Sequence, residues 1–412
     1  MSVDISFQGS KKKSFFSREL SYKNFSETLH SIAKRLSAEC HVLHENKFEL
    51  ELCPNGIIEV MFDRGNIEGG TQTSLAGPGF HKAAIDFLDM LSTQLSAEFD
   101  VEDEARYANR RNFKELQSTY ISFLNSLLNT FLKDYMDKDT AYVATWPSKK
   151  WRPADQEGII TPMGKFTHDD FSFILQNNRL EELALNYFIW YNITRDAWFH
   201  RGLALYWMWN DFCWVKPRNQ EEAAIADKIL FHLDAAKKID PSIPLPVEEW
   251  QEIASLTGKN LVITCQNNLK YLTKIGYRRN DIFVQYPRGW EAQLPGNMLA
   301  EEEENTEIYG DDLRNFRMNT HAAEDEYQFV FSEELERPCT GSEKLITQQF
   351  DLFDYKAKYR FVKDTDNPKG YWVLQGQIMS LSAMAIVTIT WQNESLTEWA
   401  LTTFMNIKGP TT

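Results

Sequence analysis

The segment Tyr187–Trp214 (YFIWYNITRDAWFHRGLALYWMWNDFCW) restricts the possible folds of this chain more than any other part of the sequence. Its indole and phenol surface exceeds what one ordinary core helix needs, and such rings stabilise a protein mainly when they leave water. Charged and histidine side chains interrupt the run, so no uncharged stretch approaches the ~20 residues that a helix needs to cross a bilayer. These are Arg195, Asp196, His200, Arg201 and Asp211. The segment therefore predicts aromatic helices of a soluble protein.

These rings have two possible uses. Helical spacing spreads the apolar side chains over more than half of the helix surface, which is typical of helices buried between two layers. The alternative is a groove for a partner, because Trp, Tyr and Arg dominate binding hot spots. In that case, the residues expected to contact the partner are Trp190, Trp198, His200, Arg201, Trp207, Trp209 and Asp211.

The first third of the chain predicts a helix-hairpin-helix unit. Apolar residues recur at intervals of three and four between Ser21 and Leu36, which indicates an amphipathic helix. Short apolar runs follow, and the turn Pro54-Asn55-Gly56 between two of them predicts a β-hairpin. The expected strands are 40–43, 48–53 and 57–62, and the expected helices after them are 80–95 and 112–136. We expect an N-terminal α+β domain over residues 1–145.

The middle of the chain predicts an α-helical layer. Residues 146–166 contain several prolines and glycines and predict an extended connector. Helical patterns resume after it, and the expected helices are 169–177, 180–194, 197–214, 220–239 and 247–256. Residues 146–257 therefore form the second expected domain.

Residues 258–412 predict a C-terminal antiparallel sheet. Alternation places Val387, Ile389 and Trp391 on one face of a strand and two threonines on the other. A closing helix over 396–407 would cover the apolar face. The expected strands are 261–265, 282–286, 290–294, 316–320, 327–331, 358–362, 371–378 and 385–391. The predicted class is α+β: an N-terminal helix-hairpin-helix unit, a central α-helical layer, and a C-terminal antiparallel sheet covered by a helix.

Two parts of the chain resemble known families. The order of strands around the turn Tyr286-Pro287-Arg288-Gly289-Trp290, with later antiparallel strands and a final helix, resembles PsbP-like α/β sandwich modules from about Gly276 to the C-terminus. That resemblance implies an accessory or protein-binding module, and the acidic segment Ala300–Asp312 departs from it. The stretch Ala235–Pro241 resembles the end of one tetratricopeptide unit, but we find no second copy at the required period.

Charge and cysteine usage limit the partner and the compartment. The formal net charge of -15 argues against nucleic-acid binding, which depends on Lys and Arg, and it could steer a basic protein toward the chain. The polar N-terminus predicts no signal peptide. The five cysteines form no CxxC pair, which favours reduced thiols and a cytoplasmic location.

The Gly-rich segment 69–79 is the candidate for an anion site. Glycines and hydroxyls before a helix can present backbone N–H groups to an anion, and the expected ligands are Gly77, Gly79, His81 and Lys82. The specific phosphate-binding motifs are absent, so a structural strand-to-helix turn is the favoured interpretation. His41 and His44 fall on a predicted strand and point to opposite sides, so we expect no metal and no cofactor.

These patterns predict a cytoplasmic, non-enzymatic protein that binds another protein. An immunity or chaperone-like partner of a bacterial toxin or secreted effector is the role that acidity, aromatic richness and missing catalytic motifs favour. The alternative is a hydrolase or transferase that acts on an anionic small molecule near residues 69–79. Oligomeric state is left open by the sequence.

Overall fold

The computed structural model describes residues 3–11, 20–138, 142–143, 151–154, 158–260, 263–271, 273–303, 306–322, 329–350, 352–363, 369–380 and 382–410. The chain forms two compact units. Unit 1 comprises Met1–Pro147, Gln156–Phe212 and Lys216–Ile275, and unit 2 comprises Ser148–Asp155, Cys213–Val215 and Gly276–Thr412. Where the sequence predicted separate domains over 1–145 and 146–257, one unit holds most of both, because the Gly-rich segment and the long fourth helix pack against the helical region.

Unit 1 contains a six-stranded antiparallel sheet in the order β2-β3-β4-β5-β1-β6. The predicted hairpin is confirmed, and Asn55 takes the left-handed conformation that its turn needs. The Gly-rich segment 69–79 begins inside a strand, β5, and Gly69 fits there because it lacks the Cβ that would overlap Phe7 and the Glu59 carbonyl. The strands are β1 (Asp4–Lys11), β2 (Glu39–His44), β3 (Lys47–Cys53), β4 (Gly56–Asp63), β5 (Asn66–Gln72) and β6 (Ala97–Asp103).

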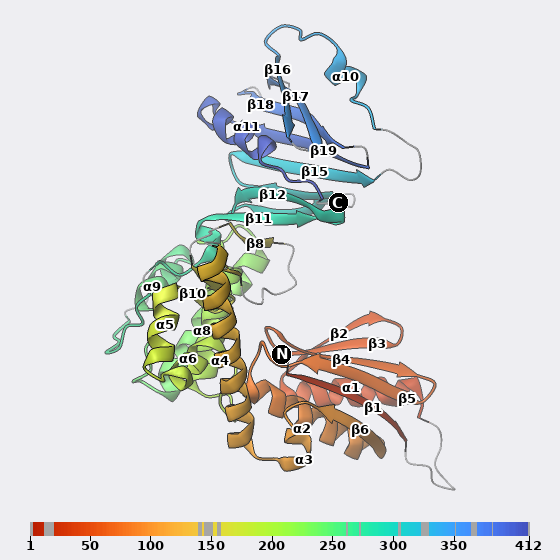
Figure 1. The fold of residues 1–412 in the computed structure, drawn as a ribbon, viewed down its shortest axis with the longest axis vertical. Coiled ribbons are helices and arrows are strands. Elements are labelled where there is room, and N and C mark those ends of the chain that lie inside the picture. The colour runs from red at the N-terminus through yellow and green to blue at the C-terminus, as the bar shows by residue number, and fades with distance from the viewer. Residues whose placement is uncertain are drawn as a thin grey trace. The chain divides into compact units, whose positions relative to one another are not determined.

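Helices α1 (Tyr22–Leu36) and α2 (Pro78–Leu95) lie along one face of this sheet (Figure 1). The Ser21 side chain caps α1 by accepting a hydrogen bond from the Asn24 N–H. Phe25 of α1 stacks on Phe62 of β4 with ring centroids 4.8 Å apart. The apolar spacing of the predicted amphipathic helix therefore forms the core between helix and sheet.

The rest of unit 1 is mainly helical. The predicted helix 180–194 is too long: α6 ends at Tyr187, and the chain runs irregularly to Asp196, whose side chain caps α7 by accepting from the Phe199 N–H at 3.1 Å. The elements are α3 (Tyr107–Arg110), α4 (Phe113–Lys138), β7 (Tyr142–Val143), β9 (Ile159–Thr161), β10 (Gly164–Phe166), α5 (His168–Gln176), α6 (Leu180–Tyr187), α7 (Ala197–Asn210), α8 (Gln220–Ile239) and α9 (Val247–Leu256). No helix in the described part of the chain is long and apolar enough to span a bilayer.

Unit 2 holds a three-stranded sheet, β12-β11-β8, and a seven-stranded antiparallel sheet, β13-β14-β15-β19-β18-β17-β16. Residues 263–265 and 329–331, expected in strands, are not in strands, while 261–262 and 327–328 lie outside the described residues. The strands are β8 (Trp151–Pro153), β11 (Asp281–Tyr286), β12 (Trp290–Pro295), β13 (Leu299–Glu303), β14 (Thr306–Gly310), β15 (Arg314–Ala322), β16 (Lys344–Phe350), β17 (Phe353–Val362), β18 (Tyr371–Met379) and β19 (Ala383–Trp391); the helices are α10 (Glu333–Glu336) and α11 (Thr397–Met405).

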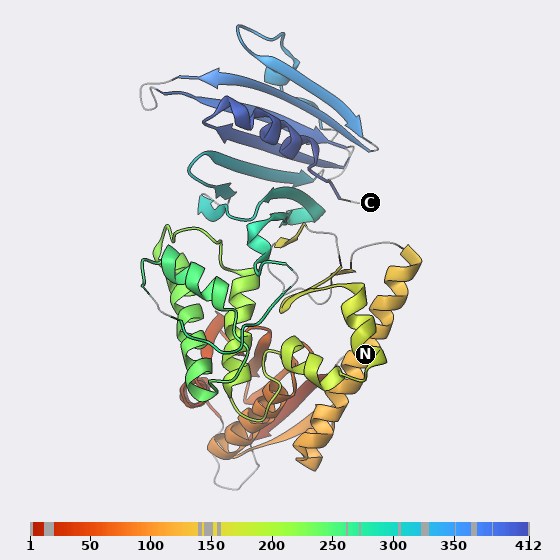
Figure 2. The ribbon, with the colours of Figure 1, turned by 90° about the vertical axis from the view of Figure 1, so that its left-hand side faces the viewer.

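Helix α11 lies across one face of the larger sheet (Figure 2). Val387, Ile389 and Trp391 are buried on that face, as predicted, and Phe404 of α11 is buried too. Within the acidic segment Ala300–Asp312, which departs from the PsbP-like resemblance, β13 pairs with β14 as an antiparallel strand. The whole chain is thus a mixed α+β protein with antiparallel sheets in both units.

Candidate functional site

Most side chains of the aromatic segment are buried in the core of unit 1. Trp190 is buried, and Trp209 is only 2% exposed, with its ring edge-on to Tyr271 at 5.6 Å. Trp198, Trp207 and three polar residues of the segment, His200, Asp196 and Asp211, are half-buried. The buried-helix interpretation therefore accounts for the largest rings, and only parts of two indoles reach the surface.

Arg201, predicted to read a partner, is 1% exposed. Its guanidinium donates to the Asn186 Oδ1 at 2.6 Å and to the Pro244 carbonyl at 3.3 Å, and it lies 4.2 Å from the Trp198 ring centroid. Burial lowers its pKa to about 10. Within the part of the chain that the structure describes, no carboxylate pairs with this cation. Neutral groups of unit 1 hold it, so its contacts are structural.

His200 of α7 meets His232 of α8, with their Nδ1 atoms 2.7 Å apart and their rings stacked. One nitrogen must donate and the other accept. Burial, followed by the charges of His200 and Lys228, lowers the pKa of His232 to about 4. Lys228 also lies 5.6 Å from the Trp207 ring centroid. The half-buried residues His200 and Trp207 are therefore in contact with α8 of the same unit.

The Gly-rich segment packs against the chain itself. The Gly79 N–H donates to the Trp190 carbonyl at 2.8 Å, and a Cβ on Gly79 would overlap the Trp190 ring. Gly77 packs in the same way against Phe188 and Trp190. Lys82 pairs with Asp86 at 2.5 Å. The N-terminus of α2, expected to present N–H groups to an anion, is thus covered by residues 188–192.

His81 belongs to a buried polar cluster that the sequence did not reveal. Its Nδ1 lies 2.9 Å from the Thr73 hydroxyl, its Nε2 lies 3.2 Å from Asp103, and the Tyr120 hydroxyl donates to Thr73 at 2.6 Å. Burial alone would raise the pKa of Asp103, but His81 and backbone N–H groups lower it. The order hydroxyl, imidazole, carboxylate is that of a nucleophilic triad.

Burial decides what this cluster does. Thr73 and His81 are 0% exposed, and the Thr73 hydroxyl already donates to the Val3 carbonyl at 2.6 Å. A nucleophile must reach a substrate, so these contacts join Val3, α2, α4 and the end of β6 without forming an active site. The Gly-rich segment therefore offers neither an open anion cradle nor an accessible nucleophile.

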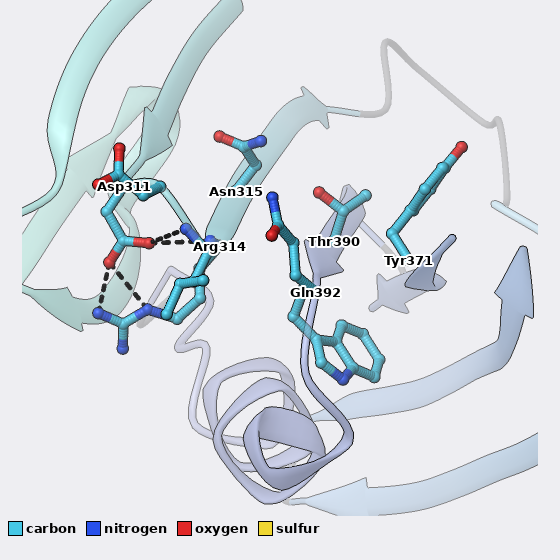
Figure 3. A pocket seen from close by; sticks show the side chains of 9 residues that line it. Asp311, Arg314, Asn315, Tyr371, Thr390 and Gln392 are labelled. Carbon is cyan, nitrogen blue, oxygen red and sulfur yellow. Dashed lines mark hydrogen bonds and ion pairs between the residues drawn. The ribbon is translucent and has the colours of Figure 1, made fainter. Parts of the chain in front are cut away.

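Unit 2 contains an open cleft of about 320 Å³ at one end of the seven-stranded sheet (Figure 3). The turn 311–313 between β14 and β15, with the first two residues of β15, Arg314 and Asn315, forms one side, and Tyr371 and residues 390–392 form the rest. Asp311 holds the turn by accepting from the Leu313 and Arg314 N–H groups at 2.9 and 2.8 Å. The turn is therefore fixed before any ligand binds.

The charged pair beside this cleft neutralises itself. The Arg314 guanidinium donates to Asp311 at 2.5 and 3.0 Å and lies 5.0 Å from the Trp399 ring centroid. Burial tends to raise the pKa of Asp311, but its bonds to Arg314 and Leu313 lower it below the ordinary value. Asp311 thus stays ionised and paired at neutral pH.

Four uncharged polar side chains, Asn315, Tyr371, Thr390 and Gln392, line the same cleft (Figure 3). Strand register places Asn315 of β15 opposite Thr390 of β19. No hydrogen bond joins any of the four side chains to another residue in the described part of the chain. Alternation predicted that Thr390 faces away from the core; the other three come from segments that only the fold brings together.

The two edges of the same sheet differ in charge. Edge strand β13 carries Glu301, Glu302 and Glu303, all exposed, and pairs with β14 alone among described strands. Edge strand β16, of sequence KLITQQF, carries one charge, Lys344, and pairs with β17 alone among them. Leu345 and Phe350 of β16 are 47% and 43% exposed. Of these two edges, β16 carries fewer charges and has the larger exposed apolar side chains.

Comparison with known proteins adds no family to this picture. A scan against protein-family models found no match to this chain, and a search of the curated proteins found none either. The resemblances to PsbP-like modules and to a tetratricopeptide unit remain predictions.

Proposed function

We propose that this protein is a non-enzymatic binding protein, and that an extended segment of a partner protein adds to the free edge of β16. An edge strand presents a row of backbone N–H and C=O groups that another strand can pair with. Six of the seven residues of β16 are exposed. This open edge is the observation that carries the proposal.

The contrast with β13 supports a selective role for β16. Charged side chains on an edge strand discourage pairing with other chains, and three consecutive glutamates do so on β13. The β16 sequence has β-branched, aromatic and amide residues and one charge, Lys344, and a strand with so little charge pairs readily with a second strand. The glutamates of β13 oppose pairing at one edge of the sheet, whereas β16 lacks such charges at the other. This difference is expected if a partner strand covers β16.

The partner's chemistry follows from the two faces of β16. Alternation puts Leu345, Thr347 and Gln349 on one face and Ile346, Gln348 and Phe350 on the other. A partner strand would place apolar side chains beside Leu345 and Phe350. The net charge of -15 favours a basic protein through long-range attraction. A bacterial toxin or secreted effector held by an immunity or chaperone-like protein is a partner of this kind.

The compartment is part of the proposal. All five cysteines are free thiols, and Cys339 is exposed. Free, exposed thiols persist in a reducing environment, so we infer a cytoplasmic site of action.

The experiment is affinity purification of the full chain from its native cells at physiological salt, with three baits. Thr347→Lys places a charge in the middle of β16, and Ala300→Lys places the same charge on β13 as the matched control. We expect a partner with the unaltered chain and with Ala300→Lys, and its loss with Thr347→Lys. Light scattering of the eluted complex separates another protein from a second copy of this chain. Equal recovery by all three baits would overturn the proposal, as would recovery of no partner.

A further inference from the structure

We propose a second, independent binding site: the cleft formed by residues 311–315, Tyr371 and residues 390–392 binds a neutral saccharide. Asn315, Thr390, Gln392 and Tyr371 line the cleft side by side (Figure 3), and in the described part of the chain no other residue forms a hydrogen bond with their side chains. Each amide both donates and accepts, and so does each hydroxyl. A ligand dense in hydroxyl groups, which also donate and accept, is the chemistry that matches all four.

The charges of the cleft exclude a strongly anionic ligand. Arg314 donates two hydrogen bonds to Asp311, and the carboxylate offsets the charge of the guanidinium. Asp312 is exposed at the rim and adds one negative charge. A phosphate or carboxylate would meet this charge without a compensating cation, whereas a neutral sugar would not.

Preorganisation favours binding at this cleft. The backbone of Gln392 donates to the Leu313 carbonyl at 3.0 Å, which ties the end of β19 to the turn that Asp311 holds. Asn315 and Thr390 sit on paired strands. Little ordering is therefore needed when a ligand binds. The volume of about 320 Å³ lies at the lower end of the range for small-molecule sites, ~300–1,000 Å³.

The polar row continues along the sheet beyond the cleft. Arg317 of β15, Thr388 of β19 and Gln375 of β18 are cross-strand neighbours, one alternation step further along the same face, and this row ends at the buried Lys358 of β17. Arg317 lies 3.9 Å from Glu303, so this second row is also close to neutral. A saccharide longer than one unit would extend from the cleft onto this row, and affinity should rise with its length.

The test is titration of the full chain with neutral glucose- and N-acetylglucosamine-based mono-, di- and tetrasaccharides, followed by calorimetry and by NMR. We expect millimolar binding of a disaccharide and tighter binding of the tetrasaccharide. Asn315→Ala and Gln392→Ala should each weaken it about 3- to 10-fold, because each removes one to two hydrogen bonds. Thr390→Val, which keeps the side-chain shape, is the second line of evidence should either alanine variant fold poorly.

The control is Gln349→Ala, which removes an exposed amide from β16 and should leave saccharide affinity unchanged. Three outcomes would overturn the proposal: no binding of any of these sugars at roughly 50 mM, equal affinity in the cleft variants and the unaltered chain, or sugar phosphates that bind more tightly than the neutral sugars. Thr347 lies outside the cleft, so Thr347→Lys should leave saccharide affinity unchanged. The test of the protein partner and the test of saccharide binding can therefore fail separately.

Discussion

The aromatic segment of unit 1 and the seven-stranded sheet of unit 2 differ in whether they expose the side chains that could bind a partner. The segment 187–212 contains side chains typical of hot spots, yet Trp190, Arg201 and Trp209 are buried. The sheet also contains such residues, among them Arg314 and Tyr371, and it exposes an edge strand with a single charge and a cleft whose amides and hydroxyls have no hydrogen-bond partner in the described part of the chain. Residue type therefore indicates how much binding energy a side chain can supply, while its exposure decides whether a partner can contact it.

The largest expected effect tests whether the aromatic segment is core. Trp209→Ala should lower the free energy of unfolding by about 3–5 kcal/mol, because it removes a buried indole and leaves a cavity. Urea unfolding followed by circular dichroism measures this. Phe231→Ala on α8 is the matched control, since that ring is 63% exposed, and it should change stability by about 0.5 kcal/mol or less. Similar small losses in both variants would mean that Trp209 faces solvent and that the segment is a binding surface after all.

The next effect tests the buried cation of that segment. Asn186→Ala removes the acceptor 2.6 Å from the Arg201 guanidinium and should cost about 1–3 kcal/mol, because a buried donor is left unsatisfied. Arg201→Met removes the charge together with its need for partners and should cost less. Adding Asn186→Ala to Arg201→Met should then have little further effect in a double-mutant cycle of unfolding free energies. Additive losses would show that Arg201 does not depend on Asn186.

Local patterns predicted part of this fold well. The hairpin around Asn55, helix α1 and the buried row Val387, Ile389 and Trp391 depend on turn chemistry and on alternation, both of which are visible in a few residues. No strand was predicted over residues 299–303, whose glutamates disfavour one. These residues form strand β13 by pairing with residues 306–310.

The candidate site was less accessible from the sequence. The sequence around Asn315, Tyr371 and Gln392 contains no binding motif. These residues come together only because β15, β18 and β19 pair in the sheet. The signal that could have revealed β16 was present in the cluster Leu345, Ile346, Thr347 and Phe350, which is rich in strand-forming types. Conversely, His81 drew attention through its loop, and the fold buries it against Asp103.

A smaller effect concerns the pH dependence of stability that arises from the contact between His200 and His232. The pKa of His232 is about 4 in the folded chain, below the ordinary ~6.5 expected on unfolding. Protonation therefore favours the unfolded state, so stability is full above pH ~6.5 and falls as the pH drops toward 4. Between pH 7 and 5, the unaltered chain should lose about 1–2 kcal/mol more than His232→Asn does.

The exposed His44→Asn serves as the control for this pH series and should follow the unaltered chain. Urea unfolding at each pH gives the free energies. A pH dependence that His232→Asn leaves intact would mean that the contact between His200 and His232 does not shape the stability of α7 and α8.

The smallest expected effect on stability belongs to the edge of unit 2. Thr347→Lys changes an exposed residue on β16, so the free energy of unfolding should shift by about 0.5 kcal/mol or less, as it should for Ala300→Lys on β13. The same Thr347→Lys should abolish partner capture, because a charge in the middle of an edge strand opposes pairing with another chain. A loss of stability above about 2 kcal/mol would show that β16 supports the core of the sheet. The aromatic segment and the sheet edge would then no longer differ, because the side chains of both would stabilise the fold and neither would be free to bind a partner.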